Sequence, residues 1–481
     1  MVAQTRRGFL RTAGLVAASL GFCSLFPGCS ALRRTTAGPG KKPNILFLFT
    51  DDQRFDTIRA LGNNQVITPN MDSLVRRGTT FTNAYIMGST SGAVCMPSRA
   101  MMLSGRNLFD LVKSGRTIPP QHIMLPELLR QAGYLTFATG KWHNGKKTFA
   151  RALTAGAKIF FGGMSDHYHV PLFDFDPAGT YHNESKYYRQ EEHSSELFSD
   201  AAVEFLHGYN GEQPFFMYVS YTAPHDPRTA PKKYRDMYDP EQIALPKNFM
   251  PEHPFDNGEM RIRDEKLAAW PRTPDEIRRH IADYYAMITH VDAQIGRVLE
   301  TLEKTGRWDN TIIVFAGDNG LALGRHGLMG KQNLYEHSIH VPLIMTGPGI
   351  EKDRKCSDFC YLQDIYPTLC DLVGVSVPQS VKSISFTPVI KGRKKRHRDI
   401  LFFAYKDFQR AVRDQRYKLI EYLVKGNRTT QLFDLRADPW ELKNLANNPN
   451  YAQQLQHLRR ELLRCKHKLG DESSFWQGYQ V

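Results

Sequence analysis

Cysteine is scarce in this 481-residue chain, which contains seven. So few cysteines exclude a disulfide scaffold, and the sequence has neither a C-x-x-C pair nor the spacing of a structural zinc site. Cys23 and Cys29 fall within the first 30 residues, and Cys95 stands alone. The remaining four have a spacing that leaves any disulfide pairing open: Cys356, Cys360, Cys370 and Cys465.

Long hydrophobic runs and internal repeats are also missing. After residue 30 no segment has 18 consecutive apolar residues, so the sequence predicts no membrane-spanning helix there. The one biased tract is the basic run Lys391–Arg398. It could bind polyanions, but such runs are more often solvated connectors, and we expect a second domain to begin here.

Residues 1–30 have the pattern of an export signal. T-R-R-G-F-L at residues 5–10 is a twin-arginine pattern, and an apolar run follows from Ala13 to Phe26. We therefore expect export by twin-arginine machinery to the periplasm or cell envelope of a bacterium. F-P-G-C at residues 26–29 is similar to a lipoprotein cleavage box, although Phe and Pro are unusual there. Lipidation of Cys29 is left open, and such an anchor would be the only membrane attachment.

Two apolar runs end in oxygen-bearing side chains. Residues 44–49 suit a strand buried on both faces of a parallel sheet and lead into Asp51 and Asp52. Residues 311–316 suit a matching strand and lead into Asp318 and Asn319. Open α/β sheets place ligands at the carboxyl ends of their strands. Three carboxylates and one amide oxygen suit calcium or magnesium.

Cys95 begins the stretch C-M-P-S-R-A-M-M-L-S-G-R. Pro97 and the run A-M-M-L favour a helix that starts near the cysteine. Because free N–H groups and the helix dipole stabilise anions at a helix N-terminus, Cys95 would lie where an oxyanion is favoured. Taken alone, the stretch fits a buried, inert cysteine equally well.

The stretch resembles the signature of the sulfatase family, C-x-P-S-R-x-x-x-L-x-G-R, and further family motifs follow in order from about Lys42 to Asn448. The resemblance implies that a formylglycine-generating enzyme oxidises Cys95 to Cα-formylglycine and that Arg99 orients its hydrate. It also implies one divalent cation, usually calcium, bound to an oxygen of residue 95 and to four side chains: Asp51, Asp52, Asp318 and Asn319.

Basic groups follow two further strand-like runs, residues 135–139 and 214–221. Lys141 and His143 lie in G-K-W-H, and His225 lies in P-H-D-P. A lone lysine or histidine after a strand is usually structural or solvated. The resemblance nevertheless implies that Lys141 and His143 contact formylglycine and sulfate. It implies that Lys331 binds sulfate, and that His225 binds sulfate and protonates the leaving oxygen.

The clearest helix begins at T-P-D-E, residues 273–276, a capping-box spacing with proline first. Apolar residues recur every three or four positions from Ile277 to Leu302, which predicts a face that packs on the sheet. Residues 149–192 and 227–270 lack periodicity and are rich in Gly, Pro and aromatics, so we expect loops around a pocket. Four residues there are candidate sugar contacts: His167, His169, Arg228 and Trp270.

After Arg398 the pattern changes to short alternating strands, at 399–405, 409–423 and 431–435, and a helix at 451–469. This predicts a small α+β domain. Together with the resemblance it implies an α/β protein whose large mixed central sheet, flanked by helices, is alkaline-phosphatase-like. We expect an export signal at 1–30, a linker at 31–41, a catalytic domain at 42–390 and a C-terminal α+β subdomain at 391–481.

The resemblance implies sulfate ester hydrolysis, with a sulfated polysaccharide or glycan as the expected substrate. Lys+Arg 63 against Asp+Glu 49 gives a net charge of +14, which would attract anions. A sulfated substrate explains this charge as well as nucleic acid does, and no nucleic-acid-binding module is recognisable, so we expect no nucleic-acid partner. Two alternatives stay open: a phosphoester or phosphonate hydrolase of the same superfamily, and a non-catalytic binder of sulfated glycans.

Overall fold

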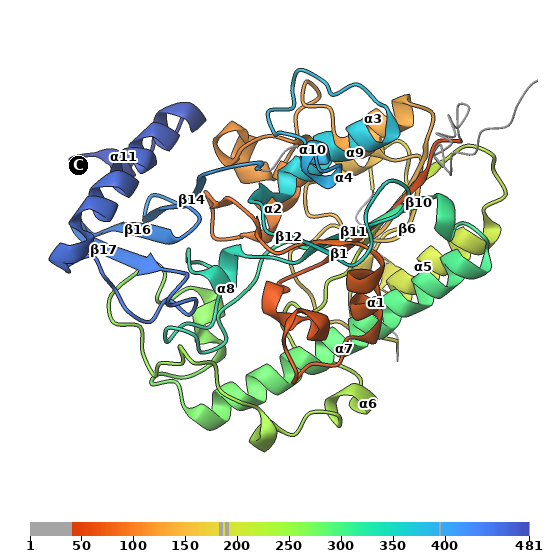
Figure 1. Ribbon diagram of the computed structural model, residues 1–481. Helices are drawn as coiled ribbons and strands as arrows, with labels where there is room; N and C mark the ends of the chain where they lie inside the picture. The colour runs from red at the N-terminus through yellow and green to blue at the C-terminus, as the bar shows by residue number, and fades with distance from the viewer. Residues whose placement is uncertain (1–40, 182–185, 188–191, 394–395, 481) are drawn as a thin grey trace, which may run out of the picture. The chain divides into compact units, whose positions relative to one another are not determined.

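An eight-stranded mixed sheet forms the centre of the chain (Figure 1). The computed structural model describes residues 41–181, 186–187, 192–393 and 396–480, so the predicted export signal and Cys29 lie outside the described residues. In spatial order the strands are β12 (Arg354–Cys356), β2 (Thr79–Phe81), β11 (Leu343–Thr346), β10 (Thr311–Gly317), β1 (Asn44–Thr50), β9 (Phe215–Ser220), β5 (Leu135–Lys141) and β6 (Ala155–Phe160). From β10 to β6 neighbouring strands are parallel, whereas β11 is antiparallel to both β10 and β2. The predicted mixed central sheet is confirmed.

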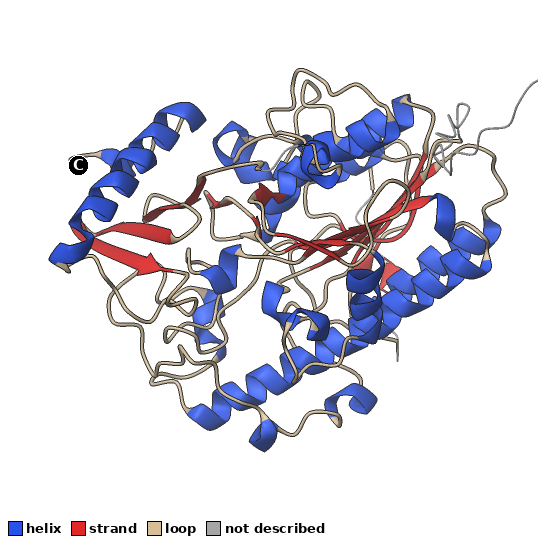
Figure 2. Ribbon diagram, in the orientation of Figure 1, coloured by secondary structure: helices blue, strands red, loops and turns tan. Residues whose placement is uncertain are grey.

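Helices cover both faces of this sheet (Figure 2). Alternate residues of β1 enter two separate cores, Phe47 one of them and Leu48 the other, because successive strand side chains point to opposite faces. The first core contains α2 (Cys95–Ser104), α3 (Leu125–Gln131), α4 (Lys146–Ala152) and α9 (Ile365–Val373). The second contains α1 (Pro69–Arg77), α5 (Ser194–Gly208) and α7 (Pro274–Lys304). No helix in the described ranges is long and apolar enough to cross a bilayer.

Helix α7 follows the prediction closely. Thr273 is its N-cap, with a side chain that accepts a hydrogen bond from the Glu276 backbone N–H, and Pro274 opens the helix. The Glu276 carboxylate accepts from the Ala269 N–H instead of completing the capping box. The apolar stripe from Ile277 to Leu302 is buried against the sheet, as its spacing requires.

A second sheet contains the C-terminal strands. Its order is β17 (Asn427–Asp434), β16 (Tyr417–Val424), β15 (Gln409–Arg413), β14 (Leu401–Tyr405) and β4 (Gly88–Ser89). Helix α11 (Ala452–Leu469) buries Leu458 and Leu462 against the same core. Because β4 comes from the segment just before Cys95, this sheet is tied to the site-bearing part of the chain. Residues 42–481 form one compact unit, and the division at 390 and 391 stays a prediction.

The remaining elements are short. Besides short 3-10 helices, they include α6 (Lys232–Arg235), α8 (Glu336–Ile339), α10 (Thr387–Ile390) and two small ladders, β3 (Ala84–Tyr85) with β13 (Cys360–Tyr361) and β7 (Pro171–Leu172) with β8 (Lys186–Tyr187). The cysteines Cys356, Cys360, Cys370 and Cys465 are buried and free, so none of the pairings left open occurs.

Two expectations about loops need correction. The segment predicted as a loop after Phe149 contains β6, which adds an edge strand to the main sheet by parallel pairing with β5. The basic run Lys391–Arg398 is only partly solvated: Lys391 and Arg393 are exposed, but His397 is buried and Arg398 nearly so. Both contact Asp364, a carboxylate far away in sequence, and a charge pattern alone does not reveal such a partner.

Candidate active site and metal site

The ends of β1 and β10 bring the predicted acids together. In the parallel register Thr50 lies opposite Gly317, so the residues that follow, Asp51 and Asp52 on one strand and Asp318 on the other, leave the sheet side by side. Asp52 has a φ of 66°, and this turn allows its backbone N–H to donate to Asp318 Oδ1 at 3.0 Å. Asn319 Nδ2 donates to Asp52 Oδ1 at 2.7 Å.

Two oxygens of this cluster lack hydrogen-bond partners among the described residues. Asp51 Oδ1 and Asn319 Oδ1 are both fully buried and unpaired. A buried polar atom without a partner is costly, and a hard cation would supply the partner. Ligand atoms of Asp51, Cys95 and Asp318 lie within 4.8 Å of one another, as do those of Asp51, Asp52 and His225. The residues present therefore fit a divalent cation.

The protonation of the acids depends on their neighbours. Burial and the charge of Asp51 raise the pKa of Asp318 to about 7, against the opposing effect of Arg99. Burial also opposes ionisation of Asp51, but Lys141 and the other basic groups nearby together outweigh it and hold the pKa of Asp51 well below its usual range. A bound cation would favour the ionised form of both acids.

Cys95 opens helix α2, with Pro97 in the first turn as predicted. Its side chain is buried, and the Sγ atom lies 3.5 Å from both Lys141 Nζ and His143 Nδ1. Burial raises the pKa of the Cys95 thiol despite the nearby Lys141 and Lys331. The unmodified residue therefore stays a thiol at moderate pH, which is a weak nucleophile.

Three cations pair with the acids, one with each. Arg99 Nε contacts Asp318 Oδ2 at 2.8 Å. Lys141 Nζ contacts Asp51 Oδ2 at 2.5 Å, and Lys331 Nζ contacts Asp52 Oδ1 at 2.6 Å. All six side chains are at most 4% exposed. The three positive and three negative charges balance in a site with little water. Electrostatic interactions with a bound anion would therefore be strong there.

The two predicted histidines follow the carboxyl ends of adjacent parallel strands, His143 after β5 and His225 after β9. His143 has a φ of 69° after β5, and burial together with the charge of Lys141 lowers its pKa well below the usual value. A neutral imidazole there can accept a proton. His225 Nδ1 lies 2.7 Å from the Asp226 carbonyl oxygen, which can only accept, so Nδ1 carries the proton. His225 Nε2 faces Asp52 Oδ2 at 3.7 Å.

Several supporting residues escaped prediction. Ser98 Oγ donates to the Asp318 carbonyl, and Arg99 Nη1 donates to Ser220 Oγ. Asp226, the neighbour of His225, forms a bidentate pair with Arg263. A serine inside a helix or at the end of a strand gives no signal of its own, whereas the acid following His225 was visible in the P-H-D-P motif.

The four candidate sugar contacts have different neighbours. His167 is buried and its Nε2 lies 3.0 Å from the His225 carbonyl oxygen, so it supports the His225 loop. His169 is exposed beside Asp166. Arg228 lies near His280, and Trp270 is 39% exposed, with the Arg272 guanidinium 4.0 Å from its ring centre.

Comparison with known families decides the identity. The family profile described as "Sulfatase" matches residues 43–375, more than half of the chain. The chain belongs to the sulfatase family. A second profile, described as "N-sulphoglucosamine sulphohydrolase, C-terminal", matches residues 324–468, which include strands β14 to β17. This sulfatase is accordingly a sulfuric ester hydrolase.

Curated relatives cover nearly the whole sulfatase. An arylsulfatase of Clostridium perfringens is 29% identical over 478 residues, covering 92% of this chain and 97% of its own. An N-acetylglucosamine-6-O-sulfatase of Bacteroides thetaiotaomicron is 28% identical over 494 residues, covering 87% and 85%.

Solved structures share the fold. A protein in complex with its substrate D-glucosamine-2-N,6-O-disulfate aligns with a TM-score of 0.75 and 24% identity over 90% of this chain and 99% of that one. A phosphonate monoester hydrolase of Agrobacterium radiobacter aligns with a TM-score of 0.72 and 22% identity, covering 89% and 96%. At these identities the likeness concerns the architecture of the sulfatase, not its substrate.

Proposed function

We propose that this sulfatase removes sulfate from a sulfated polysaccharide or glycan, with Cys95 oxidised to formylglycine as the nucleophile. The observation that carries the proposal is the position of Cys95 Sγ, 3.5 Å from Lys141 Nζ and His143 Nδ1 and grouped with Asp51 and Asp318. The sulfur marks where a hydroxyl oxygen of the hydrate would lie. A buried thiol with a raised pKa is a poor nucleophile, which favours chemistry by the modified residue.

Asp51, Asp52, Asp318 and Asn319, with an oxygen of residue 95, would hold one divalent cation, calcium by preference with magnesium as the alternative. Such an ion supplies Lewis-acid polarisation and lowers the pKa of a nearby hydroxyl. Lys141 and Lys331 would bind the sulfate oxygens and stabilise charge on the transferring group. Arg99, paired with Asp318 and bonded to Ser220, would hold residue 95 in orientation.

The two histidines would divide the proton transfers. One hydroxyl of the residue 95 hydrate would lose its proton to water and attack sulfur as the oxyanion. The sulfur–oxygen bond to the alcohol would break, and His225 would give its Nε2 proton to the leaving oxygen. His225 can do this only as the imidazolium, since Nδ1–H is committed to Asp226. His143, kept neutral by burial, then accepts the proton of the other hydroxyl as sulfate is expelled. Water restores the hydrate.

Separate observations support the substrate and the cellular context. The curated N-acetylglucosamine-6-O-sulfatase relative supports a sulfated carbohydrate. The twin-arginine pattern supports export to the periplasm or cell envelope of a bacterium, with the formylglycine-generating enzyme and the twin-arginine machinery as transient partners. Lipidation of Cys29 remains a separate expectation of the same segment.

Peptide mass spectrometry tests the nucleophile. Protein from a host with the modifying enzyme should carry an aldehyde or its hydrate at Cys95, and Cys95→Ala should lose turnover by roughly 10⁴-fold or more with the fold intact. Cys370→Ala, which changes a buried cysteine of α9, should keep full activity. Active protein with only an unmodified Cys95 thiol would overturn the proposal. Turnover of matched sulfate, phosphate and phosphonate esters separates the alternative hydrolase, and a protein inactive on all three is a binder.

A further inference from the structure

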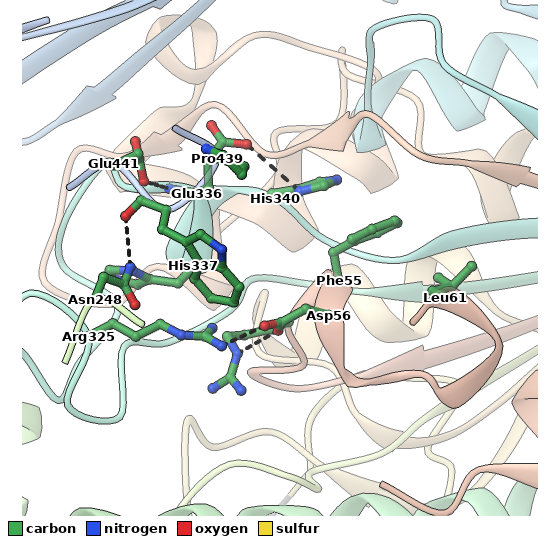
Figure 3. A pocket seen from close by; sticks show the side chains of 12 residues that line it. Phe55, Asp56, Leu61, Asn248, Arg325, Glu336, His337, His340, Pro439 and Glu441 are labelled. Atoms are coloured by element: carbon green, nitrogen blue, oxygen red, sulfur yellow. Dashed lines mark hydrogen bonds and ion pairs between the residues drawn. The ribbon is translucent and has the colours of Figure 1, made fainter. Parts of the chain in front are cut away.

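A cavity of about 430 Å³ lies beside the loops that carry the acids (Figure 3). Figure 3 shows Asn248, His337 and Arg325 on one side of it and Phe55 and Leu61 on the other. A second chamber of about 430 Å³ adjoins it and shares five lining residues: Arg54, Asp56, Leu61, Arg325 and Trp440. Both volumes are in the range of small-molecule sites. No residue assigned above to the cation or to catalysis lines either chamber.

The shared wall has an excess of positive charge. Arg54 Nε contacts Asp56 Oδ1 at 2.8 Å, and Arg325 Nη2 contacts Asp56 Oδ2 at 2.5 Å. Asp56 is the only acid that the described residues pair with either guanidinium, so two cations share one carboxylate. Burial and the neighbouring Arg54 charge lower the pKa of Arg325, as expected for like charges held together.

Two acids of the first chamber do not offset this charge. Glu336 contacts Arg413 at 3.0 Å and Lys418 at 3.1 Å, and Glu441 contacts Lys418 at 2.7 Å. Their charges are therefore balanced from outside the cavity, and an anion entering beside Arg54 and Arg325 would find a site with one uncompensated positive charge.

The same chamber contains neutral hydrogen-bonding groups without partners. His337 is 6% exposed, and within the described residues neither of its ring nitrogens has a hydrogen-bond partner. Asn248 is 4% exposed, and its Oδ1 is likewise unpaired while Nδ2 donates to the Trp440 carbonyl. Burial lowers the pKa of His337 well below its usual value, so the neutral ring offers one donor and one acceptor. Such groups suit hydroxyls, which also donate and accept.

Trp440 adds an aromatic wall. It is half-buried, with the Arg325 guanidinium 5.7 Å and Lys247 Nζ 5.9 Å from its ring centre. An aromatic face, neutral donors and acceptors and a surplus cation together match a sugar ring that carries an acidic substituent. We propose that this cavity is a second, non-catalytic site that binds an anionic sugar unit, one bearing a sulfate or a carboxylate.

Such a site would hold one unit of a polymeric substrate while another reaches the catalytic cluster, which raises the effective concentration of the second. The binding needs neither formylglycine nor a cation, so it stands or falls separately from the proposed reaction. Inactive Cys95→Ala protein is therefore a suitable background in which to measure it.

Calorimetric titration of Cys95→Ala protein with glucose 6-sulfate, glucuronate, glucose and inorganic sulfate tests the site. We expect the two anionic sugars to bind, and Trp440→Ala to weaken the binding at least tenfold or remove one class of site. The matched control is Trp308→Ala, which alters a half-buried tryptophan that also stacks on an arginine but lines neither chamber. Lys247→Glu, at an exposed position of the second chamber, should weaken binding without disturbing the fold.

Comparison of the four titrated ligands also identifies the chemical group that is bound. Binding of only one of the two sugars assigns the acidic group, sulfate or carboxylate. Equal binding by the Trp440→Ala and Trp308→Ala proteins, undiminished in Lys247→Glu, would overturn the proposal. Binding of inorganic sulfate without any sugar would overturn it too, because the aromatic wall would then have no role. Tm measurements on each variant, and turnover of a small sulfate ester in the Cys95-containing chain, verify that the fold is intact.

Discussion

Two sites in this sulfatase contain buried carboxylates paired with basic side chains. They differ in whether every carboxylate and amide oxygen has a hydrogen-bond partner. Asp364, at 0% exposure, accepts two hydrogen bonds from Arg398, one from the backbone N–H of Ile384 and one from that of Tyr361, and contacts His397. Both of its oxygens are occupied. In the cluster at the ends of β1 and β10, Asp51 Oδ1 and Asn319 Oδ1 have no partner among the described residues.

The difference separates structure from function. The cluster around Asp364 holds the segment that leads into the C-terminal sheet. Because every carboxylate oxygen there has a partner, none is free to bind a ligand. The cluster at the ends of β1 and β10 keeps unpaired oxygens because the surrounding fold holds them in place. A cation would bind those oxygens. Net charge alone does not distinguish the two.

The largest expected difference concerns activity. Asp318→Asn keeps an oxygen for Arg99 but removes one anionic ligand, so we expect the bound cation to be lost and kcat/KM to fall by roughly 10³-fold or more. Metal content measured by mass spectrometry on the purified variant tests the assignment. Asp364→Asn should keep the cation, and an unchanged calcium stoichiometry in Asp318→Asn would contradict the metal site.

Within the unsatisfied cluster, the loss of activity on replacing His225 should depend on the leaving group of the substrate, whereas the loss on replacing Lys331 should not. A nitrophenyl sulfate needs little protonation of its leaving oxygen, whereas a sugar sulfate needs much. His225→Ala should therefore slow hydrolysis of a sugar sulfate by roughly 10²–10⁴-fold and that of the activated ester considerably less. Lys331→Ala should impair both substrates more evenly, because the transferring group is charged in both. Equal losses of kcat/KM for the two substrates in His225→Ala would make His225 a sulfate anchor only.

The sequence predicts the unsatisfied cluster better than the satisfied one. Strong apolar runs place Asp51 and Asp318 at two strand ends, and parallel pairing brings strand ends together. By contrast, Asp364 is a single acid with no motif, and its partners Arg398 and His397 lie in a run typical of solvent. The cavity at Arg54 and Trp440 is equally hidden, because it joins residues 386 positions apart that no local pattern relates. The short edge strands β6 and β4 were not predicted for the same reason, because they become strands only by pairing with partners distant in sequence.

A stability effect should appear at the satisfied cluster. Asp364→Asn leaves the Arg398 charge buried without its carboxylate, so we expect a loss of about 3–5 kcal/mol in the free energy of unfolding, with kcat/KM of the folded protein unchanged. Asp399→Asn is the matched control, because it alters an exposed pair with Arg396 in the same basic run and should change stability by at most ~1 kcal/mol. Urea unfolding of both variants measures the difference, and equal losses would mean that Asp364 is no more important than a surface acid.

The last expected difference is the pH dependence of stability, which should have opposite signs for the two clusters. Burial opposes ionisation of Asp364, but Arg398 and His397 together outweigh it and hold the pKa of Asp364 well below its usual range. The contribution of Asp364 to stability is therefore present above about pH 4 and is lost as the pH falls further. The pKa of Asp318 is raised to about 7 by burial and by Asp51, so without a cation the native state binds this proton more tightly than the unfolded state does. Stability of the metal-free protein should then decline between about pH 4 and pH 7.

Two variants and added calcium separate these two pH-dependent changes in stability. With a chelator present, Asp318→Asn should flatten the decline between about pH 4 and pH 7, while Asp364→Asn should flatten the loss below about pH 4, because asparagine cannot titrate. Calcium added to the unmutated protein should also remove the first decline, since a cation favours ionised Asp318. Urea midpoints measured across this pH range supply the comparison. If the first decline survived in Asp318→Asn, titration of Asp318 would not be its cause, and burial beside Asp51 would not raise the pKa of Asp318.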